Sequence, residues 1–301
     1  MTYLWIIIGV FAVIVIFLSS MAKVASKPKV HTLEYELNKL SKLDFMQGES
    51  LKIENEHKVK SFDGYELWTG FVPGNPENKH YVILSHGYTS TRYGMYKYVT
   101  LWRKMGYNCV IYDNRGHGVN EPAAISFGWR ESKDLMAVIE DTYERYGRDI
   151  HIGLHGESMG AGLQLMALSY QPKVDFIVND CGYSEILPVL GWKANQSFHI
   201  PTWTPYLAAP FGRLFYGYWF HDVRPIDRLK ENEIPICFVH GLDDTFTHKW
   251  HSEKMYAVNK GYKELHLFEG ADHAECIVVD VKRYEKMLRE FTQKVYEQSS
   301  F

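Results

Sequence analysis

The stretch Gly156-Glu157-Ser158-Met159-Gly160 decides the fold of this chain. It fits the pattern Gly-x-Ser-x-Gly, an apolar run over residues 150–154 leads into it, and a helix-forming run follows over residues 161–168. A strand, a sharp turn and a helix in this order hold a serine hydroxyl out at the top of a sheet. Side chains at the flanking glycines would collide with the neighbouring strand or helix. The pentapeptide alone is only moderately specific, so its meaning depends on whether the chain also supplies a base and an acid.

The composition is that of an ordinary globular protein. The chain has 301 residues, 46% of them hydrophobic and 23% charged, with a net charge of −3. This length suits one large α/β domain or two small ones. Without a basic stripe there is no support for nucleic-acid binding. The four cysteines form no C-x-x-C pair, and H-E-x-x-H is absent, so we expect neither a metal nor a cofactor.

The N-terminal segment has a different composition from the rest. Residues 3–18 carry no charge, and together with residues 19–22 they reach about 20 residues, the length that crosses ~30 Å of hydrocarbon. We therefore expect residues 1–22 to be a single transmembrane anchor in the cell membrane. Ser20-Met21-Ala22 offers an alternative, a cleavage site, but the basic region that precedes the apolar core of a signal peptide is missing.

The orientation of this anchor stays open. Lys23, Lys27 and Lys29 follow the apolar run, and the positive-inside rule places them, with the remainder of the chain, in the cytoplasm. A domain that faces outward is the other possibility.

The body of the chain alternates strands with helices. Residues 23–48 predict a linker with a short helix, and residues 49–298 predict one domain. Runs from Leu51 to Ser61 and from Tyr65 to Val72, joined at Asp63-Gly64, predict a hairpin. Further strands are expected at residues 81–85, 109–112, 150–154, 174–178, 236–239 and 265–268, and helices at 93–105, 135–146, 161–168, 250–258 and 278–296. This order predicts an α/β fold with a mostly parallel sheet, helices on both faces and an antiparallel edge.

One segment interrupts the alternation. Residues 183–230 are rich in Trp, Tyr, Phe and Pro, as in the stretch 198–206. A long insertion in a compact domain is commonly a functional lid, and its aromatic content predicts a lid over an apolar pocket. The alternative is a packed helical excursion with no role in substrate binding.

An acid and a base follow Ser158 in chain order. Asp244 lies just past an apolar strand, and His273 lies just past the last strand. Loops at the carboxyl ends of parallel strands are where open α/β sheets place their sites. We expect His273 to take the proton of Ser158, and Asp244 to orient the imidazole. Asp243 competes for the acid role, and either aspartate could instead cap a turn; Asp244 is the favoured candidate.

Two loops complete the predicted site. The backbone N–H groups of Tyr88 and Met159 are expected to stabilise an oxyanion, while His86 braces its loop. In the loop 113–118, Arg115 and His117 could bind an anionic substrate, but a structural loop is favoured.

These motifs together resemble the α/β-hydrolase superfamily. They are His86-Gly87-Tyr88, Asp113-x-Arg115-Gly116-His117-Gly118, Gly156-x-Ser158-Met159-Gly160, Asp244 and Gly270-x-x-His273. Over residues 50–298 the chain is similar to bacterial serine aminopeptidase-like, lipase-like and thioesterase-like hydrolases. The resemblance implies an eight-stranded sheet, a lid after the sixth strand and no cofactor. Thr247-His248 departs from the Val-Pro that relatives often carry after the acid, which puts only the edge of the site in doubt.

The predicted function is hydrolysis of a carboxylic ester or thioester, with an apolar acyl or aryl group, through an acyl-enzyme on Ser158. An amide or small-peptide substrate is the alternative, because the same three residues cleave both. A non-catalytic binding protein at the membrane is an alternative from another class. A dehalogenase would need an aspartate at position 158, and a dinucleotide site would need a Gly or Ala at Leu165.

Overall fold

One mixed sheet forms the centre of the molecule. The structure is a computed structural model that describes residues 1–49, 52–75 and 77–298. Leu51, the expected start of the first strand, lies outside the described residues. The strands are β1 Glu54–Lys60, β2 Glu66–Val72, β3 His80–Ser85, β4 Asn108–Tyr112, β5 His151–Glu157, β6 Phe176–Asp180, β7 Ile236–Gly241 and β8 Lys263–Phe268. They are ordered β1-β2-β4-β3-β5-β6-β7-β8. The pairs β1–β2 and β2–β4 are antiparallel and all others are parallel, which confirms the predicted eight-stranded sheet with an antiparallel edge.

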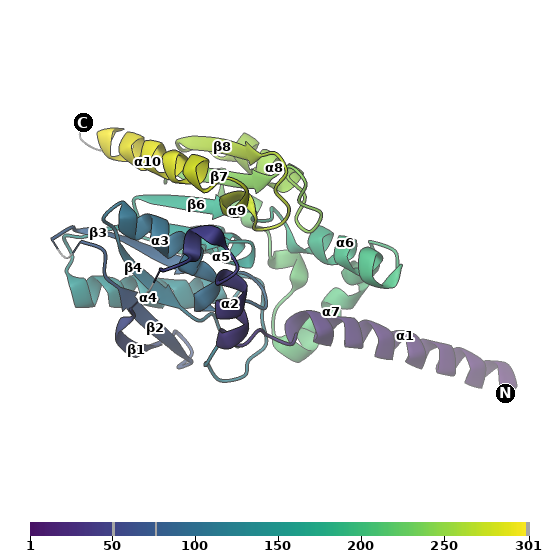
Figure 1. Cartoon of the computed structure of the whole chain (residues 1–301). Coiled ribbons are helices and arrows are strands. Elements are labelled where there is room, and N and C mark those ends of the chain that lie inside the picture. Colours follow the sequence, from purple (N-terminus) through teal and green to yellow (C-terminus); the bar gives the residue numbers. More distant parts are fainter. Residues whose placement is uncertain (50–51, 76, 299–301) are drawn as a thin grey trace.

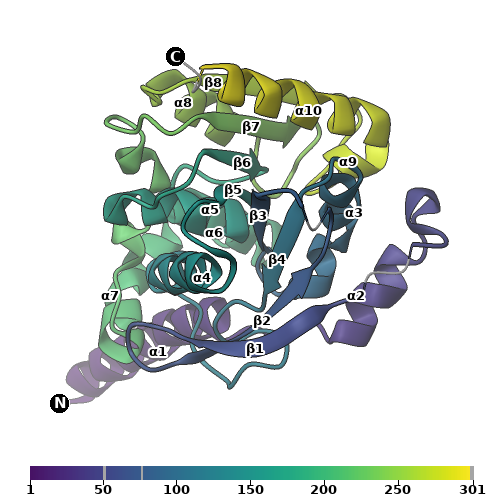
Figure 2. The ribbon, with the colours of Figure 1, turned by 90° about the vertical axis from the view of Figure 1, so that its left-hand side faces the viewer.

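Helices cover both faces of this sheet. The α-helices are α1 Thr2–Ser26, α2 Leu33–Leu40, α3 Tyr96–Lys104, α4 Glu131–Tyr146, α5 Met159–Ala167, α6 Ile186–Phe198, α7 Thr204–Tyr216, α8 Trp250–Val258, α9 Cys276–Val279 and α10 Val281–Gln298. Short 3₁₀ helices are η1 Asp44–Met46, η2 Arg92–Met95, η3 Leu168–Tyr170, η4 Phe220–Asp222 and η5 Pro225–Arg228. One apolar core packs α3 and α10 against the sheet, and a second packs α4, α5 and α8 against the opposite face (Figure 2). This is the layered arrangement that β–α alternation predicts.

Several boundaries differ from the expected ones. Helix α4 begins at Glu131, not at Leu135, because the Glu131 carboxylate accepts hydrogen bonds from the Ser126 and Gly128 backbone N–H groups and organises an earlier start. The predicted C-terminal helix is divided at Asp280, which has an extended backbone and accepts from the Arg283 N–H at the start of α10. The core positions of both helices are unaffected.

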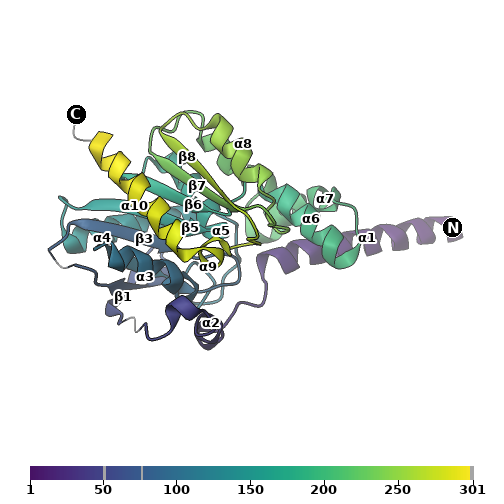
Figure 3. The same ribbon diagram turned by 45° about the horizontal axis from the view of Figure 1, so that its top comes forward.

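The N-terminal helix projects from the body. Helix α1 is long and apolar enough to cross a membrane, and its most apolar window is not buried in the protein (Figure 1). Its C-terminal part packs beside α7 of the 183–230 insertion, which lies between β6 and β7. Figure 3 shows α6 and α7 at the same end of the molecule as α1. The expected linker, residues 23–48, contains the last turn of α1 followed by α2 and η1.

Candidate active site

Ser158 lies at the sharp turn between β5 and α5. Its φ of 54° and ψ of −112° are strained for a residue with a side chain, at a cost of about 1–3 kcal/mol. Its N–H donates to the Asp180 carbonyl oxygen at 2.8 Å, which fixes the turn to β6. A Cβ at Gly156 would collide with the Gly160 backbone, and one at Gly160 would collide with the Ser85 carbonyl. The two glycines are therefore required by close backbone approach.

The structure brings Ser158, His273 and Asp244 together. The Ser158 hydroxyl oxygen is 2.9 Å from His273 Nε2, and His273 Nδ1 is 2.8 Å from Asp244 Oδ2. Because a carboxylate accepts only, the proton is assigned to Nδ1, which leaves Nε2 free to accept from the serine. The turn, the loop after β7 and the loop after β8 each contribute one member, as the chain order predicted.

Asp244 is held as a carboxylate by its surroundings. Its Oδ1 accepts from the N–H groups of Phe246 and Thr247, each at 2.8 Å. Burial by itself raises the pKa of Asp244, but hydrogen bonds from His240 and His273 outweigh that effect and hold the pKa well below its usual value. An ionised acid at this position stabilises a protonated imidazole.

The competing aspartates lie elsewhere. Asp243 is exposed at the surface. Asp272 accepts hydrogen bonds from the backbone N–H groups of Thr245 and His273, so it braces the two loops.

Sequence reasoning missed a second histidine on Asp244. His240 is the next-to-last residue of β7, is fully buried, and places Nε2 at 3.2 Å from Asp244 Oδ2. Its Nδ1 contacts the Ser252 hydroxyl at 2.7 Å. Its place directly before Gly241 at the end of an apolar run was the signal that could have found it.

The backbone N–H groups of Tyr88 and Met159 were expected at an oxyanion position. Among the described residues, neither the Tyr88 N–H nor the Met159 N–H donates to another protein group. Behind Tyr88, His86 Nδ1 donates to the Gly87 carbonyl and its Nε2 accepts from the Asn114 N–H, both at 2.9 Å. Burial lowers the pKa of His86 to about 4, so the ring stays neutral and can accept. The expected bracing role of His86 matches these contacts.

The loop 113–118 has structural contacts. Arg115 is buried and pairs with Asp134 at 2.6 Å and with Asp63 at 2.7 Å. His117 is buried and donates from Nδ1 to the Arg115 carbonyl oxygen at 2.9 Å. The Arg115 guanidinium and His117 Nδ1 are thus used within the protein, whereas His117 Nε2 has no hydrogen-bond partner among the described residues.

A cavity of about 220 Å³ opens at Ser158 and His273. One of its walls is formed by the segment 31–43, which includes α2. Its lining includes the Lys97–Glu157 ion pair, at 2.6 Å, and Glu36, whose carboxylate is buried 2.8 Å from His31 Nδ1. The described residues of the 183–230 insertion do not line it. The wall of the cavity at the serine is thus formed in part by α2, and it carries polar as well as apolar side chains.

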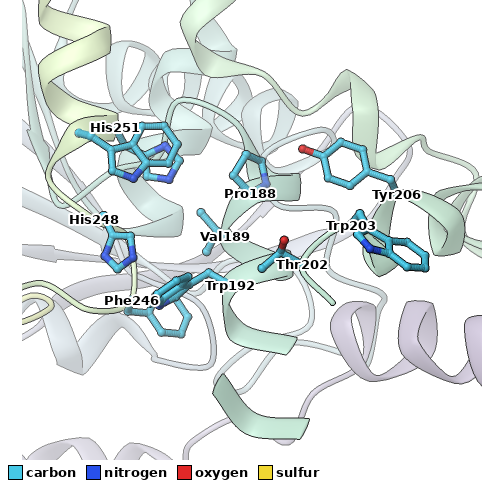
Figure 4. Close-up of a pocket in the computed structure, with 10 residues that line it drawn as sticks. Pro188, Val189, Trp192, Thr202, Trp203, Tyr206, Phe246, His248 and His251 are labelled. Atoms are coloured by element: carbon cyan, nitrogen blue, oxygen red, sulfur yellow. The ribbon is translucent and has the colours of Figure 1, made fainter. Parts of the chain in front are cut away.

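A second, aromatic cavity lies under the insertion. It has a volume of about 400 Å³ and is lined by Pro188, Val189, Trp192, Thr202, Trp203, Tyr206, Phe246, His248, Trp250 and His251. In Figure 4, Trp203 and Tyr206 lie at one end, and Phe246 and His248 at the other. The ring centroid of Phe246 is 4.8 Å from that of His273. Phe246 therefore lies both in the wall of this cavity and beside His273.

Two of the catalytic candidates, together with Cys181, also have the donor types of a metal site. Ligand atoms of Cys181, Asp244 and His273 lie within 4.8 Å of one another. Burial beside Asp180 and Asp244 raises the pKa of Cys181 well above its usual value, so its sulfur is a thiol, whereas metals bind the thiolate. The hydrogen bonds among Asp244, His273 and Ser158 account for the arrangement.

Known structures with the same architecture include the Pyrococcus furiosus esterase Pf2001. Its chain superimposes with a TM-score of 0.67 at 23% identity, over 81% of this chain and 91% of that one. The protein is an α/β-hydrolase by fold. The Pyrococcus horikoshii acylaminoacyl peptidase has a TM-score of 0.64 at 19% identity, over 83% of this chain but 43% of that chain. Esterase and peptidase chains therefore share this fold.

Sequence comparisons agree with this assignment. Residues 76–179 match the model of the family described as "Serine aminopeptidase, S33". An uncharacterised protein of Bacillus subtilis (strain 168), YqkD, is 28% identical over 236 residues, which is 77% of each chain. The family match ends before the residues of the acid and the base, so their roles in this α/β-hydrolase are argued from geometry.

Proposed function

We propose that this α/β-hydrolase is a serine hydrolase that cleaves a carboxylic ester or thioester. The observation that carries the proposal is the continuous hydrogen-bonded chain from Ser158 through His273 to Asp244. Ser158 Oγ attacks the carbonyl carbon as its proton passes to His273 Nε2. The Tyr88 and Met159 N–H groups bind the resulting oxyanion, and each such donor is worth roughly 2.7–4 kcal/mol of barrier.

The second half of the reaction releases the acid. Collapse of the tetrahedral intermediate expels the alcohol or thiol, which takes the proton from His273, and leaves the acyl group on Ser158 Oγ. Water then gives a proton to His273 as its oxygen attacks the acyl carbon. Ser158 leaves with that proton, and the carboxylic acid departs.

The two cavities suggest how substrate binds. The aromatic cavity under the insertion suits an apolar acyl or aryl group, for which Phe246 must turn aside. The polar cavity at Ser158 suits the leaving group. In this reading the 183–230 insertion is a lid.

An amide or small-peptide substrate is the second candidate. Its support is the carboxylate of Glu36 in the cavity at Ser158, which could accept from an amine, together with the description of the matching family. Glu36→Gln should weaken turnover of an aminoacyl anilide more than turnover of a neutral ester if this candidate is correct.

The membrane anchor is part of the proposal. Helix α1 fits a single-pass anchor by length and composition. Within it, Ala22 and Ser26 are buried against the body, so a cleavage after Ala22 would cut through a packed helix. This favours the uncleaved anchor and leaves the side of the membrane open.

The test compares p-nitrophenyl esters of increasing acyl length with a thioester series and an aminoacyl p-nitroanilide. Wild type, Ser158→Ala and Ser169→Ala are assayed, since Ser169 is exposed in η3 and remote from the cavity. We expect Ser158→Ala alone to lose both turnover and labelling by a fluorophosphonate. Turnover that survives in folded Ser158→Ala would refute the mechanism, and turnover of the anilide alone would favour the amidase.

A further inference from the structure

Helix α7 buries small residues and exposes large apolar ones. Its buried stripe consists of small residues, including Ala208, Ala209 and Gly212. Its exposed stripe carries larger ones, with Leu207 at 52% and Leu214 at 72% exposure. A surface helix of a soluble protein shows the opposite pattern. Small residues at a helix contact and large apolar residues outside are typical of helices in a membrane.

The small face of α7 belongs to the region where α1 packs. Helices α1 and α7 are in contact, and Ala22 and Ala209 belong to one buried cluster. The Ser26 hydroxyl is 2.8 Å from the Tyr218 hydroxyl, just after α7. Lys27 Nζ lies 6.0 Å from the Tyr216 ring. The C-terminal ends of the two helices are therefore neighbours, and the N-terminal end of α7 points away from the body, as that of α1 does (Figures 1 and 3).

The exposed part of α1 is shorter than the hydrocarbon core of a bilayer. Residues 2–14 are exposed, whereas Val15, Leu18, Ser19 and Ala22 are partly or fully covered on one face. At ~1.5 Å per residue the exposed part is about 20 Å long. A bilayer has a hydrocarbon core of ~30 Å. About 10 Å of the span must then lie at the level of α7.

The composition of this part of the insertion permits such a position. Residues 198–216 contain a single Asp, Glu, Lys or Arg, which is Arg213. Arg213 is near the C-terminal end of α7, and its guanidinium donates to the Gly217 carbonyl at 3.0 Å. Phe198 and Trp203 are exposed at the opposite end. An exposed apolar patch of this kind marks an interaction site.

We propose that the N-terminal part of α7, with Phe198 and Trp203, is immersed in the same leaflet as the C-terminal part of α1. The partner of this surface is a lipid bilayer. The inference rests on α1 spanning the membrane, and it adds that the proposed lid is itself a membrane-inserted element. Because Trp203 and Tyr206 line the aromatic cavity, the end of the cavity that they form faces the lipid.

Nitroxide labels on introduced cysteines test this arrangement in the full chain. The four native cysteines are buried, so mild labelling reaches the introduced ones. The variants are Val10→Cys on α1, Leu207→Cys and Leu214→Cys on α7, and Val119→Cys as an exposed apolar control on the body. The protein is placed in phosphatidylcholine–phosphatidylglycerol vesicles, and collision rates with oxygen and with a water-soluble nickel chelate are compared.

We expect the ratio of the oxygen to the nickel collision rate to be highest for Val10→Cys and to fall in the order Leu207→Cys, Leu214→Cys and Val119→Cys. The ratio for Leu207→Cys should be several times that of the control, Val119→Cys. If Val10 is in lipid but Leu207 matches Val119, the inference is overturned while the anchor stands. If the label at Val10 is in water, both the membrane anchor and the inference fail. Protection of Leu207 from both reagents would indicate a protein partner or a second copy, and would also overturn it. None of these readouts requires activity, so they are independent of the proposed hydrolysis.

Discussion

The Tyr88 hydroxyl donates a hydrogen bond to the Ala25 carbonyl oxygen at 2.8 Å. This contact joins the loop of the proposed oxyanion site to the last turn of the apolar N-terminal helix. The His31 N–H donates to the Thr89 carbonyl at 2.8 Å and adds a second connection to the same loop. The segment 25–31 is therefore a structural part of the site and more than a tether.

Deletion of residues 1–30 should lower both stability and activity, whereas deletion of residues 1–14 should affect neither in detergent. The longer deletion removes the Ala25 carbonyl that accepts from Tyr88, a hydrogen bond worth about 0.5–1.5 kcal/mol, and the buried Ala22 and Ser26. Urea unfolding midpoints and kcat/KM for a soluble ester measure the two effects.

Tyr88→Phe provides the finer control for this prediction, because it removes only the hydroxyl. We expect a loss of about 1 kcal/mol in unfolding free energy. Equal stability and activity of both deletions would show that the contacts to the loop contribute nothing.

Much of the site could be predicted because it depends on local sequence. The turn at Ser158 needs glycines on both sides for steric reasons, and those glycines are visible in the chain. Asp244 and His273 each follow an apolar strand, and parallel strands carry their following loops to one edge of the sheet. The sheet itself follows from the alternation of short apolar runs with helical ones.

The walls of the site could not be predicted in this way. Helix α2 is short and charged, and its sequence resembles that of a linker. Its position at the Ser158 cavity depends on contacts with residues far along the chain, such as the region of Gly94. His240 was missed for a related reason, since its bond to Asp244 depends on the path of the loop after β7. Packing between distant segments leaves no periodic signal.

Asp244→Asn should reduce kcat by roughly 10⁴, because the imidazole loses the partner that fixes its tautomer. Asp243→Asn is the matched control. It changes the neighbouring residue in the same loop by the same chemistry, but Asp243 is exposed. We expect it to retain near wild-type turnover of the p-nitrophenyl ester. A comparable loss in both variants would point to damage of the loop rather than to a role of one carboxylate.

Phe246→Ala should raise kcat/KM for long acyl chains relative to short ones. The Phe246 ring lines the aromatic cavity and lies 4.8 Å from the His273 ring, so its removal joins the cavity to the catalytic candidates. The measurement is the ratio of kcat/KM between a long and a short p-nitrophenyl ester.

Phe215→Ala serves as the control for this substitution, since Phe215 is exposed on α7 and does not line the cavity. It should leave the ratio unchanged. If Phe246→Ala lowers turnover of both esters equally, the aromatic cavity is not the acyl site.

The protein should lose stability as the pH falls below about 6.5 because histidines are buried in neutral form. Burial lowers the pKa of His86 to about 4, and those of His117 and His155 to about 3. Below the usual histidine pKa of about 6.5 the unfolded chain binds protons that the folded chain does not, so unfolding becomes more favourable as the pH falls. Each such histidine contributes a slope of about 1.4 kcal/mol per pH unit.

His117→Asn should make the fall of the unfolding free energy with decreasing pH shallower, because asparagine does not titrate. Its amide can still donate to the Arg115 carbonyl. Between pH 6.5 and about pH 5 one histidine accounts for about 2 kcal/mol. His199→Asn is the matched control, since His199 is exposed and has a left-handed φ of 54° that asparagine tolerates. Urea unfolding at several pH values measures the slopes. A slope in His117→Asn that equals those of wild type and His199→Asn would mean that His117 is not held neutral by burial.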